Sequence, residues 1–121
     1  MASAGAIRVM VADDHAIVRE GLRTYLGLQA GIDVVGEAED GASAIDQCCR
    51  LRPQVVLLDV QLPDTDGFNV CARLMGYDGS PKVILTSSRD SSDFGPLVHT
   101  SGARGFVPKA ELSGERVQEL L

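Results

Sequence analysis

The run of four apolar residues from Val55 to Leu58 constrains the fold of this chain more than any other sequence feature. It is too short for a helix and lacks the helical period of about 3.6 residues, whereas such runs are typical of strands buried on both faces of a parallel sheet. Asp59 follows the run directly, at the start of a segment rich in turn-forming residues. Open parallel sheets bind ligands outside the carboxyl ends of their strands, so Asp59 is a candidate functional residue. A single aspartate in this place more often caps a turn. The residues at the other strand ends therefore decide whether Asp59 is interpreted as functional.

Length and composition indicate one globular domain that spans residues 1–121. The chain has 121 residues, of which 45% are hydrophobic, and this is enough to bury a core. No apolar run approaches the roughly 18 to 20 residues that cross a bilayer. The segment from Met1 to Ala6 lacks the basic flank of a signal peptide, so we expect no membrane association. The net charge of −6 argues against nucleic-acid binding by the surface as a whole.

The cysteines and histidines suggest neither a disulfide framework nor a zinc site. Cys48, Cys49 and Cys71 are odd in number, and two of them are adjacent. We expect reduced thiols that pack as small apolar groups, which favours a cytoplasmic location. His15 and His99 form no metal-ligand pair with a nearby cysteine or aspartate, and we interpret both as ordinary residues.

Hydrophobic patterning predicts five strands that alternate with five helices. The predicted strands are Ile7–Ala12, Ile32–Ala38, Val55–Leu58, Lys82–Ser87 and Gly105–Pro108. Connections of a few residues and right-handed crossovers then give an α/β sandwich, with a parallel sheet covered by helices on both faces.

Apolar residues at helical spacing predict the buried faces of the first three helices. These faces are Val18, Leu22, Tyr25, Leu26 and Gln29, then Ile45, Cys48 and Cys49, then Phe68, Cys71, Ala72 and Met75. We expect Asp14 to be the N-cap of the first helix. The second helix begins at Asp40 and runs to about Leu51, before Pro53.

The last two helices are weaker predictions. The segment from Arg89 to Ser101 should be helical by position, yet it contains Gly95 and Pro96, and glycine alone costs about 1 kcal/mol against alanine. Ser113 is the expected cap of a short final helix, whose apolar positions are Val117, Leu120 and Leu121.

Polar residues follow four of the predicted strands and meet at one edge of the sheet. They are Asp13 and Asp14, Asp59, Thr86 and Ser87, and Lys109. Two ionised carboxylates about 5 Å apart repel each other by about 3 kcal/mol at an effective dielectric constant of ~20, and one lysine leaves three carboxylates negative overall. Oxygen ligands without histidine or cysteine favour Mg²⁺. A site neutralised in this way can accept a phosphoryl group, with Asp59 as nucleophile and with Lys109 and the Thr86 hydroxyl holding phosphoryl oxygens.

These residues together resemble the receiver domain of two-component response regulators, over essentially the whole chain. The resemblance rests on Asp13-Asp14, Asp59 with Pro63 and Gly67, Thr86, Phe106 and Lys109. It implies a flavodoxin-like sheet of order 2-1-3-4-5. It also implies that Asp59 takes a phosphoryl group from the phosphohistidine of a sensor histidine kinase, and that the domain catalyses no other reaction.

The resemblance also implies roles for individual residues. Mg²⁺ would be bound by Asp14, Asp59 and the main-chain carbonyl of Gln61, with Asp13 acting through water. Thr86 and Phe106 would form the conformational switch, and Gln61 and Ser88 would set the lifetime of the phosphoryl group. The fourth helix, fifth strand and fifth helix would form the signalling face, through a homodimer or a docked partner.

Ala110 follows Lys109 where the commonest receiver pattern has proline, and Pro108 precedes it. The missing Lys-Pro pair, the Asp14-His15 pair and the segment from Val18 to Leu22 resemble the subclass, LuxR-type or FixJ-like, whose output is a helix-turn-helix DNA-binding domain. Such a domain is absent from this chain. Either the chain is the receiver of a longer transcription factor, or it is a stand-alone regulator that acts by protein contact.

Three rival interpretations remain. Haloacid-dehalogenase-type phosphatases need a second aspartate two residues after the nucleophile, where this chain has Gln61. A flavin- or nucleotide-binding module needs a glycine-rich loop after the first strand, where Asp13 and Asp14 would repel an anion. A receiver-like interaction domain that is never phosphorylated is the third.

Overall fold

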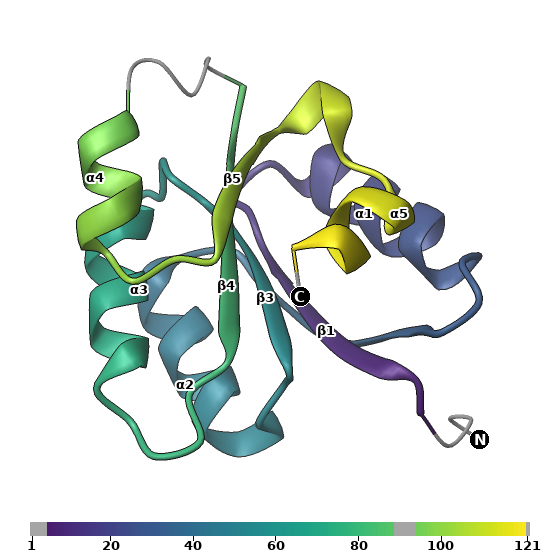
Figure 1. Cartoon of the computed structure of the whole chain (residues 1–121), viewed down its shortest axis with the longest axis horizontal. Coiled ribbons are helices and arrows are strands. Elements are labelled where there is room, and N and C mark those ends of the chain that lie inside the picture. The colour runs from purple at the N-terminus through teal and green to yellow at the C-terminus, as the bar shows by residue number, and fades with distance from the viewer. Residues whose placement is uncertain (1–4, 89–93, 121) are drawn as a thin grey trace.

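The computed structural model describes residues 5–88 and 94–120 as a parallel five-stranded sheet with helices on both faces (Figure 1). The strands are β1 (Ile7–Ala12), β2 (Ile32–Ala38), β3 (Val55–Asp59), β4 (Lys82–Ser87) and β5 (Gly105–Pro108). They pair in the order β2-β1-β3-β4-β5, and all four pairings are parallel. The predicted α/β class and the flavodoxin-like order are confirmed.

The helices form two layers. They are α1 (Ala16–Gly27), α2 (Gly41–Leu51), α3 (Gly67–Met75), α4 (Gly95–Thr100) and α5 (Gly114–Glu119), and a 3-10 turn, η2 (Lys109–Glu111), follows β5. Helices α2, α3 and α4 cover one face of the sheet, and α1 and α5 cover the other (Figure 1). Within the part of the chain that the structure describes, no helix is both long and apolar enough to cross a bilayer.

The central strand β3 is buried on both faces, as its apolar run predicts. Val56 and Leu58 belong to the hydrophobic cluster beneath α2, α3 and α4, whereas Val55 and Leu57 belong to the cluster on the α1 and α5 side. Successive side chains of a strand point to opposite faces, so one uninterrupted run serves both layers. Asp59 is the last residue of this strand and is also buried.

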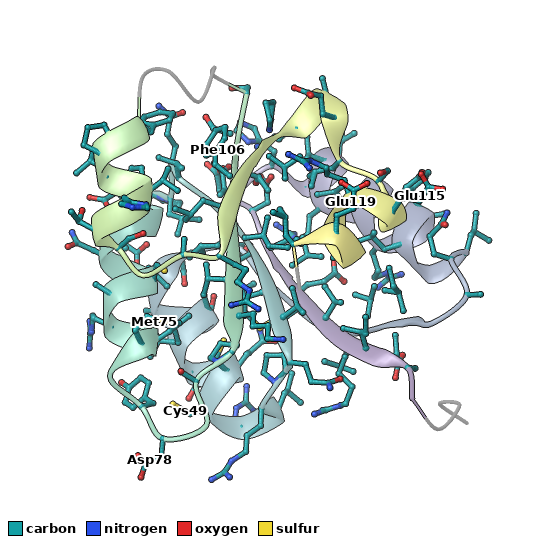
Figure 2. The ribbon with its side chains drawn as sticks, in the orientation of Figure 1. Cys49, Met75, Asp78, Phe106, Glu115 and Glu119 are labelled. Atoms are coloured by element: carbon teal, nitrogen blue, oxygen red, sulfur yellow. The ribbon has the colours of Figure 1, made fainter. Side chains whose placement is uncertain are left out.

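The predicted faces of the first three helices are partly wrong. On α1, Leu26 is buried but Tyr25 is 43% exposed. On α2, Cys48 is buried and Cys49 is exposed, at the end of the helix away from the Asp59 edge (Figure 2).

The buried face of α3 is also rotated from the prediction. Gly67, Val70, Cys71 and Leu74 are buried, while Ala72 is exposed. The buried positions therefore centre on Val70, Cys71 and Leu74, and the tilt of the helix on the sheet leaves Ala72 toward solvent.

The ends of the helices show two further differences. The N-cap of α1 is His15, without a side-chain cap, and not Asp14. Helix α4 begins only at Gly95, with Pro96 in its first turn, where proline is tolerated. The predicted helical segment from Arg89 to residue 93 lies outside the described residues, as does Leu121.

The predicted cap of helix α5 and its first apolar position are confirmed. The Ser113 hydroxyl accepts a hydrogen bond from the Arg116 N–H at 3.0 Å, and Val117 is buried. Glu115 and Glu119 lie on the outer side of this helix (Figure 2).

Arg8 fastens the end of α2 to the sheet. Its guanidinium donates to the carbonyl of Leu51 at 2.7 Å and to the carbonyl of Arg52 at 2.9 Å. The last carbonyls of a helix have no partner within the helix, so these two bonds satisfy groups that would otherwise depend on water.

We therefore expect Arg8→Ala to lower the free energy of unfolding by about 1–2 kcal/mol, because charged donors are lost from two carbonyls. Urea unfolding followed by circular dichroism measures this. Arg50→Ala is the control: Arg50 makes an exposed ion pair with Asp46 at 3.1 Å, and such pairs contribute about 0.5 kcal/mol or less. Equal losses in the two variants would contradict the role given to Arg8.

Candidate functional site

The sheet brings the predicted strand-end residues to one edge. Asp13 directly follows β1, Asp59 ends β3, and Lys109 follows β5. The β3–β4 register pairs Asp59 with Thr86. Parallel strands place their carboxyl ends together, and this is why residues far apart in the sequence share one site.

Lys109 binds both buried carboxylates. Its Nζ lies 2.8 Å from Asp13 Oδ2 and 2.9 Å from Asp59 Oδ2. The Asp13 and Asp59 side chains are 2% and 3% exposed, so water screens these charges poorly. One ammonium group therefore compensates two carboxylates that repel each other.

Burial dominates the electrostatics of Asp59 and raises the pKa of its carboxyl above the ordinary value. The Gln61 N–H donates to Asp59 Oδ1 at 3.0 Å and Lys109 donates to Oδ2, and both bonds oppose the rise. Burial acts to lower the pKa of Lys109, but the hydrogen bonds and charges of Asp13 and Asp59 outweigh it, and the pKa of the ammonium is raised. The lysine is therefore held as a cation.

The site also fits a hard divalent cation. One potential ligand atom from each of Asp13, Asp14, His15 and Asp59 lies within 4.8 Å of the others. Among residues 5–88 and 94–120, Asp13 Oδ2 is the buried side-chain oxygen that accepts no well-aligned hydrogen bond, although Lys109 is close to it. Three carboxylates against one lysine leave negative charge uncompensated, and carboxylate oxygens are the ligands that Mg²⁺ prefers. Asp13, Asp14 and Asp59 thus fit the predicted ion.

The interpretation of His15 as an ordinary residue is wrong. Its Nδ1 lies 3.1 Å from Asp14 Oδ1 and 3.3 Å from Asp13 Oδ1, and its backbone N–H donates to Asp13 Oδ1 at 2.9 Å. The signal for this placement was its position directly after the acidic pair. Because the chain turns into α1 there, the imidazole is brought back over the carboxylates.

Sequence reasoning also missed Arg19. Its guanidinium donates to the backbone carbonyl of Asp13 at 2.6 Å and lies 3.5 Å from a carboxylate oxygen of Glu37. The helix α1 is thereby tied to the backbone that carries the acidic pair. Spacing gave no signal for this contact, because the acceptor is a main-chain atom.

Gly67 allows the loop after β3 to fold back on the site. A Cβ at this position would lie 2.4 Å from the carbonyl oxygen of Asp59 and 2.9 Å from the Cα of Val60. Both are backbone atoms that cannot rotate away. Glycine is therefore required where the first turn of α3 passes the end of β3, and this contact helps to fix Asp59.

The other predicted site residues lie at the same edge but differ in exposure. Thr86 is buried, whereas Ser88 and Gln61 are exposed. Phe106, the second residue of β5, is half-buried on the side facing α4 (Figure 2). Its ring centroid lies 5.8 Å from that of Phe94, which directly precedes α4.

Comparison with known proteins gives consistent matches. A family model described as the response regulator receiver domain matches residues 9–120. The chain is 37% identical over 115 residues to a transcriptional regulatory protein named NarL from Mycobacterium tuberculosis, covering 95% of the chain and 53% of that protein. The chain therefore spans about half the length of this relative.

Solved structures agree. The signal receiver domain of the NarL response regulator from Mycobacterium tuberculosis superposes with a TM-score of 0.88 at 35% identity, covering 94% of each chain. A LuxR-family two-component response regulator from Aurantimonas sp. SI85-9A1 superposes with a TM-score of 0.85 at 32% identity, covering 93% of this chain and 81% of that one.

The burial of Asp59 predicts a pH-dependent cost in stability. Since the pKa of Asp59 is raised in the folded state, folding favours its protonated form. The contribution of Asp59 to stability is therefore most favourable below the ordinary pKa of 3.8 and is lost as the pH rises through the folded-state pKa. We expect Asp59→Asn to raise the free energy of unfolding by about 1–2 kcal/mol at pH 7, with the gain disappearing in acid.

Thermal unfolding of Asp59→Asn and wild type from pH 3 to pH 8 measures this gain. Asp46→Asn, at an exposed position on α2, is the control and should show no comparable gain. A gain that stays constant over the whole pH range would mean that the ionisation of Asp59 is not its cause.

Proposed function

Because the chain belongs to the response regulator receiver domain family, we propose that Asp59 is the acceptor of a phosphoryl group from the phosphohistidine of a sensor histidine kinase. One observation carries this assignment: a buried carboxylate at the carboxyl edge of the sheet, bound by the ammonium of Lys109. The LuxR-type relatives belong to the same family of two-component regulators. The sensor kinase and a cytoplasmic location follow from this class of signalling.

In the transfer, an oxygen of the Asp59 carboxylate attacks phosphorus. The bond between phosphorus and the kinase imidazole nitrogen breaks, its electron pair returns to that nitrogen, and an aspartyl phosphate forms. Lys109, already 2.9 Å from Asp59 Oδ2, is placed to pair with a phosphoryl oxygen, and the Thr86 hydroxyl is the candidate donor to another. Water later hydrolyses the aspartyl phosphate, which releases inorganic phosphate and restores the carboxylate, and the domain catalyses no other reaction.

Mg²⁺ would be held by Asp14, Asp59 and the main-chain carbonyl of Gln61, with Asp13 acting through water. When bound, the ion supplies positive charge that offsets the charge of the phosphoryl group. The protein's own contribution is to hold Asp13 and Asp59 in place, which Lys109 does by its two ion pairs.

Thr86 and Phe106 would form the switch that reports phosphorylation. Thr86 is buried beside Asp59 in the sheet register, so its reorientation toward a phosphoryl group would change the packing around β4. Phe106 contacts Phe94 at the start of α4, and such a change could pass to that helix. Helix α4, β5 and α5 would then form the signalling face, as a homodimer interface or for another partner.

The output would be transcriptional, through a LuxR-type DNA-binding domain outside this chain. Support comes from relatives that are transcriptional regulators of about twice this length. A stand-alone regulator that acts by protein contact is the alternative. A receiver-like domain that works without phosphorylation is a further alternative, and the next experiment excludes it if Asp59 is modified.

We expect Mg²⁺-dependent phosphorylation of Asp59 by acetyl phosphate, because the carboxylate is positioned beside its compensating lysine. Intact-mass spectrometry should show one added phosphate in wild type and none in Asp59→Asn or after chelation of Mg²⁺. Asp66→Asn, at an exposed cap of α3, serves as the control and should still be labelled. Labelling that survives Asp59→Asn would defeat the assignment.

Gln61 and Ser88 should control the lifetime of the aspartyl phosphate. Both are exposed beside the site, where their side chains limit the approach of water. Gln61→Ala and Ser88→Ala should each speed dephosphorylation on the order of tenfold, which corresponds to about 1.4 kcal/mol in the barrier, and change phosphorylation less. The rate of phosphate loss after removal of acetyl phosphate measures this. Ser80→Ala, before β4 and thus at the opposite edge, should leave it unchanged, and an unaltered lifetime in both site variants would refute the role.

A further inference from the structure

We infer that Asp64 is a positioning residue, which holds the loop carrying Gln61 against the N-terminus of α2 and thereby sets the site's affinity for Mg²⁺. This inference rests on the proposed function of the Asp59 site. Asp64 itself lies in the loop between β3 and α3 and is exposed. Its carboxylate nevertheless makes two hydrogen bonds to another element: Gly41 N–H donates to Oδ1 at 2.8 Å, and Ala42 N–H donates to Oδ2 at 3.0 Å.

Two carboxylates divide the first amide groups of α2 between them. Asp64 accepts from Gly41 and Ala42, and Asp40, the N-cap, accepts from Ser43 N–H at 2.7 Å. These amides have no partner within the helix, and the helix dipole favours negative charge at this end. The hydrogen bond from Gly41 is the main reason that the pKa of Asp64 is lowered, and the carboxylate stays ionised at neutral pH.

The loop and the helix also touch directly, and Gly41 makes this possible. A Cβ at Gly41 would lie 2.4 Å from Thr65 Cγ2, 3.1 Å from Val70 Cγ2 and 3.2 Å from Asp64 Oδ1. Thr65 is short and branched at Cβ, so its methyl group has little room to move away. The contact therefore depends on both a glycine on the helix and a carboxylate on the loop.

We call the contact of Asp64 and Thr65 with the N-terminus of α2 the clamp. It acts on Gln61 through a short loop that is held by its own hydrogen bonds. Leu62 N–H donates to the Thr65 carbonyl at 3.2 Å, and Gln61 pairs with Asp66 as an isolated antiparallel bridge. Displacement of the tip at Asp64 is thereby passed to Gln61. The Gln61 N–H binds Asp59 Oδ1, and its carbonyl is the proposed metal ligand.

The two caps of α2 provide a matched pair of variants. Asp64→Ala and Asp40→Ala each remove a carboxylate from the same helix end, but only Asp64→Ala releases the loop. We expect Asp64→Ala to weaken Mg²⁺ binding on the order of tenfold in calorimetric titration, the effect typical of losing a residue that orients a ligand. Asp40→Ala should bind Mg²⁺ as wild type does. Asp64→Asn, which retains one acceptor oxygen, should fall between wild type and Asp64→Ala.

Gly41→Ala provides an independent test from the other side of the contact. Alanine is the better helix former. If the contact served only to stabilise α2, Gly41→Ala would therefore leave the stability of that helix unchanged or raise it. The clamp predicts weaker Mg²⁺ binding, because the new Cβ pushes Thr65 and the loop away. Hydrogen exchange of metal-free protein is the second readout: the amides of Gln61 and Leu62 should lose protection in Asp64→Ala and Gly41→Ala, but not in Asp40→Ala.

The outcomes separate this inference from the proposed function. Wild type that neither binds Mg²⁺ nor becomes phosphorylated would overturn the proposed function. Wild type that does both, together with wild-type Mg²⁺ affinity in Asp64→Ala and Gly41→Ala, would overturn only the clamp. Equal weakening in Asp64→Ala and Asp40→Ala would also overturn it, because a general loss of helix stability would then suffice.

Discussion

The ion pairs of Lys109 with Asp13 and Asp59 are the interaction on which the site depends. A single ammonium group lies 2.8 and 2.9 Å from oxygens of two buried carboxylates, which come from different strands. Without it, two negative charges would face each other where water is largely excluded, at a high cost in free energy. The lysine therefore joins the ends of β1, β3 and β5 and makes a buried acidic site compatible with a folded sheet.

That compensation is incomplete, which fits the proposed binding of a cation at the site. Burial still raises the pKa of Asp59, and Asp13 Oδ2 lacks a well-aligned hydrogen bond among the described residues. A bound cation would supply the positive charge that the protein alone does not. The apolar strands beneath the site, buried on both faces, provide the stability that such a destabilised edge requires.

The sheet could be predicted from the sequence more reliably than the helix faces. Short apolar runs such as Val55–Leu58 have one stable environment, between two layers. The alternation of strands and helices predicted a parallel sheet, and the family resemblance predicted its strand order. Helix faces require a rotation and a tilt as well as a period. Tyr25 and Cys49 fit the helical period but lie toward solvent, because only the residues of a helix that lie nearest the sheet pack against it.

The sequence by itself determined which chemical groups stand at the strand ends, since Asp13, Asp59 and Lys109 each directly follow or end a strand and Thr86 is the penultimate residue of β4. It determined much less about contacts between elements. The bonds of Arg8 to the end of α2 and those of Asp64 to its beginning came from the tertiary structure alone. The physical reason is that these contacts join side chains to main-chain groups of other segments. Their formation depends on how the chain turns and how neighbouring elements pack, which no local pattern encodes.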